Sequence, residues 1–303
     1  MNKNMRSYIA PGIIHFMAFP ETIKGDGPIV ESVLKIAEDD YFDFIEMAWI
    51  KDNVQRNEVK SILDTAGMGI GYAAQPRTLL TGLNLNHLDN HERAKAVATI
   101  KEGIDEAYEL GAKGLGFLSG KWSEESKDEA FEALVESTGE ICRYAAGKGD
   151  LKIHLEIFDS EIDKCSLIGP VSLAKKFAAL LCRDYDNFGL LPDLSHLPLL
   201  KESAKESLVP IADYISHTHI GNCVMKDPTM PAYGDQHPRF GFPGSENGVE
   251  ELAEYLRVLI DIGYLVEGAP KPVSFEVKPF EHESSALVIA NAKRALNAAW
   301  VVL

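Results

Sequence analysis

Positive charge is scarce in this sequence. Its 303 residues carry 30 Lys and Arg against 46 Asp and Glu, which gives a formal net charge of −16. Proteins hold phosphate backbones with clustered Lys and Arg, so we expect no nucleic-acid partner. A local basic pocket for a small anion remains compatible with this charge.

Cysteine is also rare, and long apolar runs are absent. The four cysteines, at 142, 165, 182 and 223, form no C-x-x-C pair, which is typical of reduced thiols in the cytoplasm. No stretch is apolar enough over a sufficient length to span a bilayer, so we expect no membrane partner. The apolar part of the first twenty residues is interrupted by Pro11 and His15 and offers no small-residue cleavage site. We interpret it as a first strand rather than a signal peptide.

The chain alternates between strand-like and helical segments. The clearest helical pattern repeats apolar residues on one face of 94–110 and closes at Gly111, and a second, over 249–260, begins after Asn247. A final helix is expected over 285–299. The expected strands are segments 12–20, 42–50, 67–75, 112–120, 151–159, 187–195, 214–222 and 272–279.

Eight strand-then-helix units predict a closed (β/α)₈ TIM barrel of the α/β class, with parallel strands and right-handed crossovers. An open doubly wound sheet is the alternative. It would more often show G-x-G-x-x-G after the first strand, where this chain has AFPETIKGDG. No Pro/Ser-rich linker divides the chain, so we expect a single domain over 1–303.

Four of the expected strands each carry a metal-type ligand at or near the end. These ligands are Glu156 in HLEIFD, Asp193 in LLPDLSH, His219 in SHTHIGN and Glu276 in SFEVKP. Three carboxylates and one imidazole form a hard, mostly oxygen site that suits Mn²⁺, Mg²⁺ or Co²⁺. Each residue alone has a simpler interpretation, such as a buried ion pair or, for Asp193, a helix cap.

Strand periodicity supports a shared polar face. His154 and Glu156 have the same parity along one strand, and Glu276 and Lys278 share a parity along another, while the alternate positions are apolar. Barrel active sites lie at the carboxyl ends of strands. The pattern therefore predicts a polar site at that end of an otherwise apolar barrel.

At these residues the chain resembles the xylose-isomerase-like barrels, and within them the sugar and sugar-phosphate isomerase/epimerase group that includes ketose 3-epimerases. The resemblance implies one divalent cation, Mn²⁺ foremost, with Mg²⁺, Co²⁺ or Zn²⁺ as alternatives. The group's pattern is matched by Glu156, by Asp193-Leu-Ser-His196, by His219 and by Glu276, and Glu46 occupies the place of a strand-2 glutamate found in many members.

Two departures from that group concern the substrate. Epimerases of the tagatose type have a second Glu about two helical turns after the strand-5 ligand, where this chain has Ile162 with Glu161 beside it. The segment after the seventh strand, 222–247, is unusually long and carries Arg239. We expect it to close over the substrate as a lid, with a subunit interface as the alternative.

The residues suggest a proton-transfer mechanism. Glu156 and Glu276 are the candidate catalytic bases on opposite faces of a sugar carbon, beside a cation that acidifies it. His196 and Lys278 are expected to stabilise oxyanion charge. The remaining candidates for substrate binding are His154, which is equally compatible with a core histidine, Arg239, and Glu46, which we expect to hydrogen-bond a ligand rather than to be one.

The function predicted is a cytoplasmic, metal-dependent sugar isomerase or epimerase acting on a small-molecule sugar or sugar derivative, and a homo-oligomer is compatible with the sequence. The main alternative is a lyase that cleaves 3-keto-glycosides on the same scaffold. A non-catalytic sugar-binding barrel is a further alternative. An apurinic-site nuclease is disfavoured by the acidic charge and the small number of ligands.

Overall fold

Eight parallel strands form the centre of the molecule in the computed structural model, which describes residues 4–303. Their order in the sheet is β6-β5-β4-β3-β2-β1-β8-β7. Two isolated parallel bridges, Leu190 with Ile215 and Asp193 with His219, join β6 to β7. The fold is therefore the predicted (β/α)₈ TIM barrel. The strands are β1 (Ile9–Ile14), β2 (Phe44–Met47), β3 (Gly69–Ala73), β4 (Gly114–Leu118), β5 (Lys152–Glu156), β6 (Phe188–Leu191), β7 (His219–Gly221) and β8 (Lys271–Glu276).

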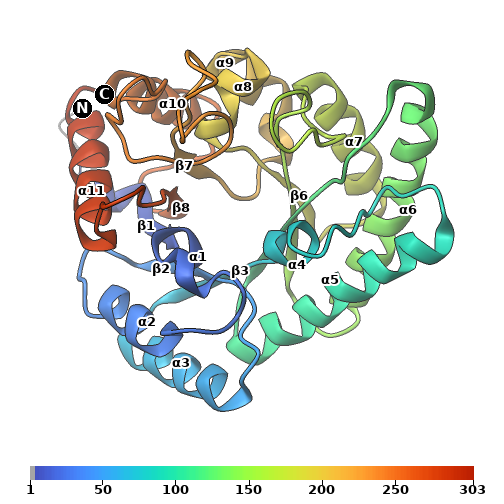
Figure 1. The fold of residues 1–303 in the computed structure, drawn as a ribbon, viewed down its shortest axis with the longest axis horizontal. Coiled ribbons are helices and arrows are strands. Elements are labelled where there is room, and N and C mark those ends of the chain that lie inside the picture. The colour runs from blue at the N-terminus through green and yellow to red at the C-terminus, as the bar shows by residue number, and fades with distance from the viewer. Residues whose placement is uncertain (1–3) are drawn as a thin grey trace.

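Seven long helices surround the strands, and four short helices lie near the strand ends or between strands (Figure 1). The long helices are α2 (Ile29–Ala37), α3 (Asn53–Ala66), α5 (Asn90–Leu110), α6 (Lys127–Ala146), α7 (Val171–Asp184), α10 (Val249–Asp261) and α11 (Ser285–Val301). The short ones are α1 (His15–Ala18), α4 (Gln75–Leu79), α8 (Leu197–Leu200) and α9 (Ala204–Leu208). Within residues 4–303, no helix combines the length and the apolar character needed to cross a membrane.

Helix α5 illustrates how the sequence sets these elements. Asp89 caps its start, since the carboxylate accepts hydrogen bonds from the backbone N–H groups of His91 and Glu92. The helix ends at Gly111, whose φ of 83° is left-handed and is tolerated because glycine has no Cβ. Its inner face buries Ile100 and Ile104 completely against the strands.

Six of the eight predicted strand segments contain an observed strand, and the first and last overlap β1 and β8, each of which begins before the predicted segment. The first strand differs most, because β1 begins at Ile9 and ends at Ile14, whereas the prediction was 12–20. The apolar run continues past Ile14, but its backbone turns into helix α1. Apolar composition alone does not distinguish a buried strand from a buried helical turn.

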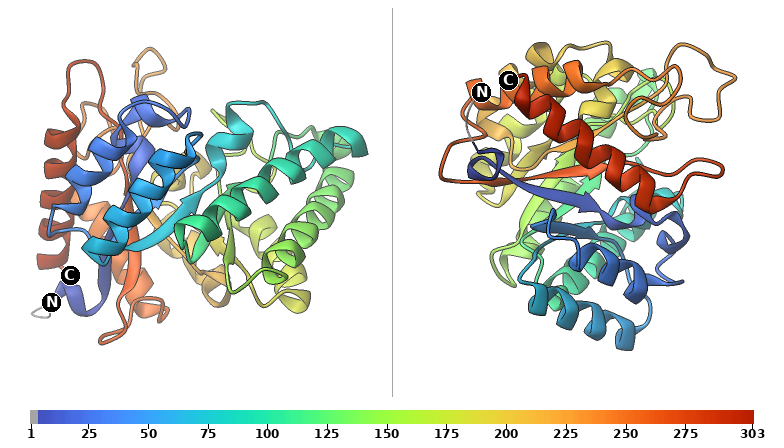
Figure 2. Two further views of the ribbon diagram at one scale, coloured as in Figure 1. Left: turned by 90° about the horizontal axis from the view of Figure 1, so that it is seen from below. Right: turned by 90° about the vertical axis from the view of Figure 1, so that its left-hand side faces the viewer.

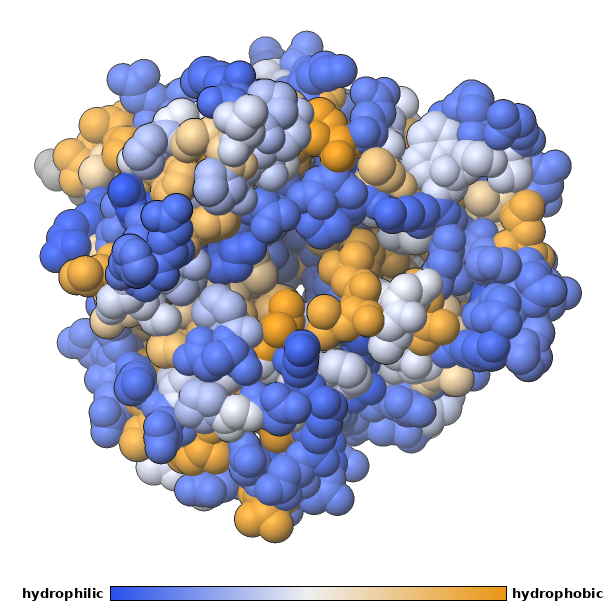
Figure 3. All heavy atoms as spheres, in the orientation of Figure 1, coloured by the Kyte–Doolittle hydropathy of each residue, from blue (hydrophilic) through white to orange (hydrophobic). Residues whose placement is uncertain are grey.

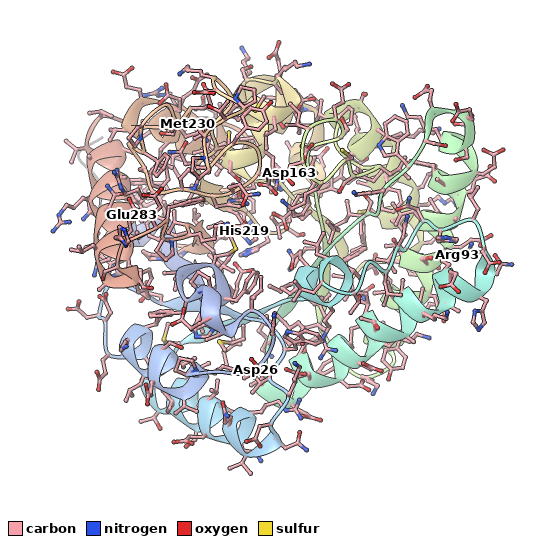
Figure 4. The ribbon with its side chains drawn as sticks, viewed as in Figure 1. Asp26, Arg93, Asp163, His219, Met230 and Glu283 are labelled. Carbon is pink, nitrogen blue, oxygen red and sulfur yellow. The ribbon has the colours of Figure 1, made fainter. Side chains whose placement is uncertain are left out.

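The carboxyl ends of the strands are covered by α1, α4 and the segment between β7 and α10. Figure 2 shows part of this segment projecting from the body of the molecule, and Met230 lies on it (Figure 4). Its inner part does not project, since Asp235 and His237 are buried. This segment therefore contributes a wall to the carboxyl-end face of the barrel.

Candidate metal centre and active-site cavity

The four predicted ligands meet at the carboxyl ends of four strands. Glu156 is the last residue of β5 and Glu276 the last of β8. Asp193 follows the end of β6 and is bridged to His219, the first residue of the short strand β7. One ligand atom from each lies within 4.8 Å of the other three, and all four residues are buried. His219 Nδ1 is 3.4 Å from Glu156 Oε1 and 3.0 Å from Glu276 Oε2.

The free atoms of this group fit a cation. Glu156 Oε1, His219 Nδ1 and Glu276 Oε2 are buried without a hydrogen-bond partner. Burying such atoms uncompensated is costly, and a divalent cation among them would satisfy all three. Burial alone lowers the pKa of His219, but the surrounding carboxylates, led by Glu46, outweigh it and raise the pKa well above the usual value. The same negative field would attract a metal ion.

Asp193 acts as a helix cap as well as a candidate ligand. Its Oδ1 accepts the backbone N–H of Ser195 at 2.8 Å, which caps the 3₁₀ helix Leu194–His196. Its Oδ2 accepts the Ser195 hydroxyl at 2.6 Å. Burial raises the pKa of Asp193, and the nearby Glu276 carboxylate raises it further. The two interpretations of this residue that the sequence left open are thus compatible.

Glu46 lies on the side of His219 that faces away from Glu156 and Glu276. Its Oε1 is 3.1 Å from His219 Nε2 and 2.7 Å from Nε2 of His217. Burial raises the pKa of Glu46, but His219 and His217 outweigh burial and hold it well below the usual value. Such a partner fixes the orientation of a metal-binding imidazole.

His154 faces the opposite end of the barrel. Its Nδ1 is 2.6 Å from Ser216 Oγ, and it lines a separate cavity of about 160 Å³ together with Gly114 and Lys152, which begin their strands. A Cβ at Gly114 would lie 2.3 Å from the His154 ring, so glycine provides the space for it. Burial lowers the pKa of His154 to about 3, so the ring is neutral.

A cavity of about 320 Å³ opens above the candidate metal ligands. Of the four ligands, Glu276 is the one that lines it, whereas Glu156 lies deeper. A larger cavity, about 440 Å³, lies between α2 and α11 and contains none of the candidate site residues. The apolar wall of the cavity beside Glu276 consists of Ile14, Phe16, Met17, Pro20, Ile23, Ala73, Pro76, Leu79, Leu80 and Phe158. Its polar residues are Gln75, Lys164, Asp235, Gln236, His237, Glu276 and Lys278.

Hydrophobic residues gather around the depression at the centre of this face (Figure 3). Leu79 and Leu80, which line the cavity, are nearly half exposed. The cavity thus combines one apolar wall with one polar wall. Phe16 and Phe158 are the aromatic residues of the apolar wall.

Gln75 was not identified from the sequence. Its Nε2 donates to Glu156 Oε2 at 2.6 Å and so holds that carboxylate, while its own Oε1 is buried without a partner beside the cavity. The available signal was its position just beyond the carboxyl end of β3, on the side of the barrel where the other candidate site residues lie.

Asp235 and His237 come from the long segment after β7. His237 Nε2 is 2.7 Å from Asp235 Oδ1 and 3.4 Å from Glu276 Oε1. His237 has a φ of 52°, an uncommon left-handed conformation for a non-glycine residue. Lys164 pairs with Asp235 Oδ2 at 2.9 Å. The segment therefore supplies fixed charged groups next to the candidate metal ligands.

His196 is completely buried behind this pair. Its Nδ1 donates to the Ile157 carbonyl at 2.7 Å, and its Nε2 lies 3.1 Å from Asp235 Oδ1. Burial lowers the pKa of His196, but Asp235 and Asp193 outweigh burial and raise it well above the usual value. Asp193, His196 and His237 also bring one potential ligand atom each within 4.8 Å. His196 Nε2 and His237 Nδ1 lie 3.8 and 3.9 Å from Asp193 Oδ2.

Arg239 and Lys278 differ in position. Lys278 lines the cavity, and its Nζ donates to Gln236 Oε1 at 2.9 Å. Burial, reinforced by the charge of Lys164, lowers its pKa. Arg239 does not line the cavity and instead donates from Nε to Glu283 Oε1 at 2.6 Å. Figure 4 shows Glu283 beside α11, apart from His219.

The fold and these residues define a (β/α)₈ barrel with a buried carboxylate–imidazole centre at the carboxyl ends of its strands. The chain belongs to the xylose isomerase-like TIM barrel family, whose model matches residues 34–296. No curated protein matches it.

Solved structures with the same fold include several sugar epimerases. A D-tagatose 3-epimerase-like protein has a TM-score of 0.72 and 18% identity, with 97% of this chain and 99% of that chain covered. D-psicose 3-epimerase from Clostridium cellulolyticum H10, solved with D-tagatose, has a TM-score of 0.65 and 18% identity, covering 97% and 98%. The 3-keto-D-glucoside 4-epimerase YcjR from E. coli has a TM-score of 0.67 and 16% identity, covering 97% and 99%.

Proposed function

We propose that the protein is a divalent-metal-dependent sugar isomerase or epimerase. The observation that carries this proposal is the convergence of three unpartnered, buried ligand atoms beneath a cavity that one of the ligands, Glu276, also lines. Sugar epimerases among the structures of the same fold support a sugar substrate.

The cation would be held by Glu156, Asp193, His219 and Glu276. When bound, it supplies Lewis-acid polarisation of a sugar carbonyl and the neighbouring hydroxyl, which makes the C–H bond between them more acidic. A set of three carboxylates and one imidazole favours Mn²⁺, with Mg²⁺, Co²⁺ and Zn²⁺ as alternatives.

Glu276 and Glu156 have unequal positions for proton transfer. Glu276 lines the cavity and so is the base with direct access to a substrate carbon. Glu156 is almost completely buried, and Gln75 holds one of its oxygens. We assign removal of the proton to Glu276. We assign its return, from the opposite face of the carbon, to Glu156. Return to the same carbon gives epimerisation, and return to the neighbouring carbon gives isomerisation.

Lys278 and Gln75 would bind the substrate oxygens. The Lys278 ammonium lies on the polar wall beside Glu276 and can stabilise negative charge on an oxygen during proton transfer. The free Oε1 of Gln75 can accept a sugar hydroxyl. We further propose a cytoplasmic location, because all four cysteines are free thiols.

Exchange of a substrate proton with solvent deuterium tests the proposal. Protein loaded with Mn²⁺ should incorporate deuterium from D₂O into ketohexoses or 3-keto sugars beside the carbonyl, and Glu276→Gln should abolish the exchange. Metal content must be measured for the variant, since the amide is also a poorer ligand. Absence of exchange with every sugar, while the metal is bound, would contradict an isomerase or epimerase.

A lyase acting on 3-keto-glycosides is the second candidate. The mixed apolar and polar walls of the cavity favour it, because a glycoside would place a second group beyond the sugar ring. His154 is too far below the cavity to serve as its acid, and Lys278 or His237 would take that role. Release of an aglycone from a 3-keto-glycoside would distinguish this reaction from isomerisation.

A further inference from the structure

A second cavity adjoins the one above the metal ligands. Its volume is about 430 Å³, and it shares two lining residues, Leu79 and Lys164, with the cavity that contains Glu276. It lies over the segments that follow β3, β4 and β5, so it opens on the same face of the barrel. The two cavities thus form adjacent compartments, with Lys164 and Leu79 between them.

The floor of the second cavity is held by a dense hydrogen-bond network. The Asn84 and Asn86 amides each donate to the Lys121 carbonyl at 2.9 Å, and the Gly120 N–H donates to Asn86 Oδ1 at 2.6 Å. Lys121 also pairs with Ser166 in an antiparallel bridge. A preformed surface of this kind binds a ligand without having to become ordered first.

The boundary between the cavities is equally well defined. The buried Asp159 carboxylate accepts hydrogen bonds from the backbone N–H groups of residues 162, 163 and 164, at 2.6, 2.9 and 2.7 Å. Cys165 then adopts a left-handed φ of 51°, which turns the chain after Lys164. Lys164 is in turn paired with Asp235 at 2.9 Å, so its side chain has a fixed position at the edge that the two cavities share.

The lining of the second cavity has the mixed character that suits a sugar ring. Asn84, Lys121, Asp163 and Ser166 offer polar groups, whereas leucines at 79, 83, 85 and 118 offer apolar surface. Sugar rings present hydroxyls at their edges and C–H groups on their faces, so a site for a sugar ring needs both polar groups and apolar surface. Within residues 4–303, Lys121 forms no ion pair, which leaves its ammonium available to a ligand hydroxyl.

We propose that the natural substrate has two rings: a keto sugar in the cavity beside Glu276, joined through a glycosidic bond to a second sugar ring in the adjoining cavity. This inference rests on the proposed function for the identity of the first ring. Each cavity separately lies toward the lower part of the range of ligand sites, roughly 300–1,000 Å³, and each has the space for one ring.

Calorimetric titration of the Mn²⁺-loaded protein tests the proposal with four sugars. D-Fructose supplies one ring, and maltulose, isomaltulose and lactulose each supply a fructose unit joined to a second ring through a different linkage. At least one of the three should bind at least about tenfold more tightly than fructose, because several additional hydrogen bonds are made. The proposal is overturned if none binds more tightly than fructose, or if none of the four binds.

A blocking variant locates the second ring. Lys121→Trp should fill the second cavity and remove the advantage of the two-ring sugar, with fructose affinity changed by less than about twofold. Lys127→Trp, a surface change in the helix that follows the same segment, is the matched control and should retain the advantage. An unchanged two-ring affinity in Lys121→Trp, with the melting temperature preserved, would overturn the assignment to this cavity.

Deuterium exchange separates this inference from the proposed reaction. If the two-ring sugar binds preferentially but no sugar exchanges a proton with D₂O, the second ring's site stands and the isomerase proposal fails. If fructose exchanges and two-ring sugars show no preference, the reaction stands and the two-ring substrate is wrong.

Discussion

Glu46 Oε1 lies 3.1 Å from Nε2 of His219, the imidazole nitrogen that does not face the metal site. With a cation bound at Nδ1 the ring would be neutral, and a hydrogen bond there would keep its one proton on Nε2 and leave the Nδ1 lone pair, on the side of Glu156 and Glu276, for the cation. The strand-2 glutamate thus determines the chemical state of a ligand located on β7.

Replacing Glu46 should therefore weaken metal binding without removing a ligand. We expect Glu46→Gln to raise the dissociation constant for Mn²⁺ roughly 10- to 100-fold, because the amide fixes the His219 tautomer less strongly. Isothermal titration calorimetry measures this directly. Glu58→Gln, an exposed change on α3, is the control. Equal affinities for Glu46→Gln and the wild type would remove Glu46 from this role.

Metal removal should lower the stability of the protein. The buried carboxylates of the site repel one another when no cation is present, and a cation bound only to the folded state stabilises it by about 2.7 kcal/mol at 100 times its dissociation constant. Thermal unfolding with Mn²⁺ should thus occur at a higher temperature than with EDTA. Asp193→Asn should reduce that difference, and identical transitions for the wild type in both conditions would contradict a metal site here.

His15 should make stability pH-dependent in the acid range. It is buried with Nε2 2.8 Å from Ser32 Oγ, and burial lowers its pKa to about 3. The unfolded chain, with a pKa of about 6.5, binds the proton first, so the contribution of this group is complete above about pH 6.5 and decreases as the pH falls toward 3. The decrease is at most about 1.4 kcal/mol per pH unit.

Urea unfolding at pH 7.0 and 5.5, in EDTA, measures this effect. Between pH 7.0 and 5.5 the unfolding free energy of His15→Asn should decrease by about 1–2 kcal/mol less than that of the wild type, because position 15 then carries no titrating group. His91→Asn changes an exposed histidine on α5 and should follow the wild type. Parallel losses in all three proteins would show that His15 is not buried in the neutral form.

Asp159 should be a major stabiliser of the segment between β5 and α7. Its carboxylate accepts three backbone N–H groups while completely buried, and a hydrogen bond to a charged group contributes about 1.5–3 kcal/mol. Asp159→Ala should therefore lower the unfolding free energy by at least about 3 kcal/mol in urea. Asp227→Ala removes a similar but exposed hydrogen bond, from the Thr229 backbone N–H to the Asp227 carboxylate, and should lower the unfolding free energy by less than about 1 kcal/mol. Similar costs for the two would contradict this assignment.

The convergence of Glu156 and Glu276 could be predicted because the end of a strand fixes the position of a residue in two ways. The end places a residue on the catalytic face, and alternation along the strand chooses the lumen side. Glu156 and Glu276 satisfy both conditions and come together as expected. His154 shows the limit of this reasoning, since it shares the face of Glu156 but lies two residues lower and opens toward the other end of the barrel.

Residues contributed by loops could not be predicted in this way. Asp235 and Lys164 lie in segments without periodicity, and their positions depend on contacts distant in sequence, such as their pairing with each other. Arg239 was chosen as the arginine of its loop, but its guanidinium instead pairs with Glu283, which the sequence does not place nearby. Loop conformation depends on tertiary partners more than on local composition.

The junction between β6 and β7 has a consequence for the dynamics of the barrel. Asp193 and His219 are at once backbone neighbours across this junction and candidate ligands of the same cation, and the His219 N–H donates to the Pro192 carbonyl at 3.1 Å. A bound ion would therefore link the ends of these two segments at the point where the sheet has the fewest backbone hydrogen bonds between strands. Amide hydrogen exchange at 216–219 should report metal occupancy, because local opening of the barrel begins where pairing is sparsest.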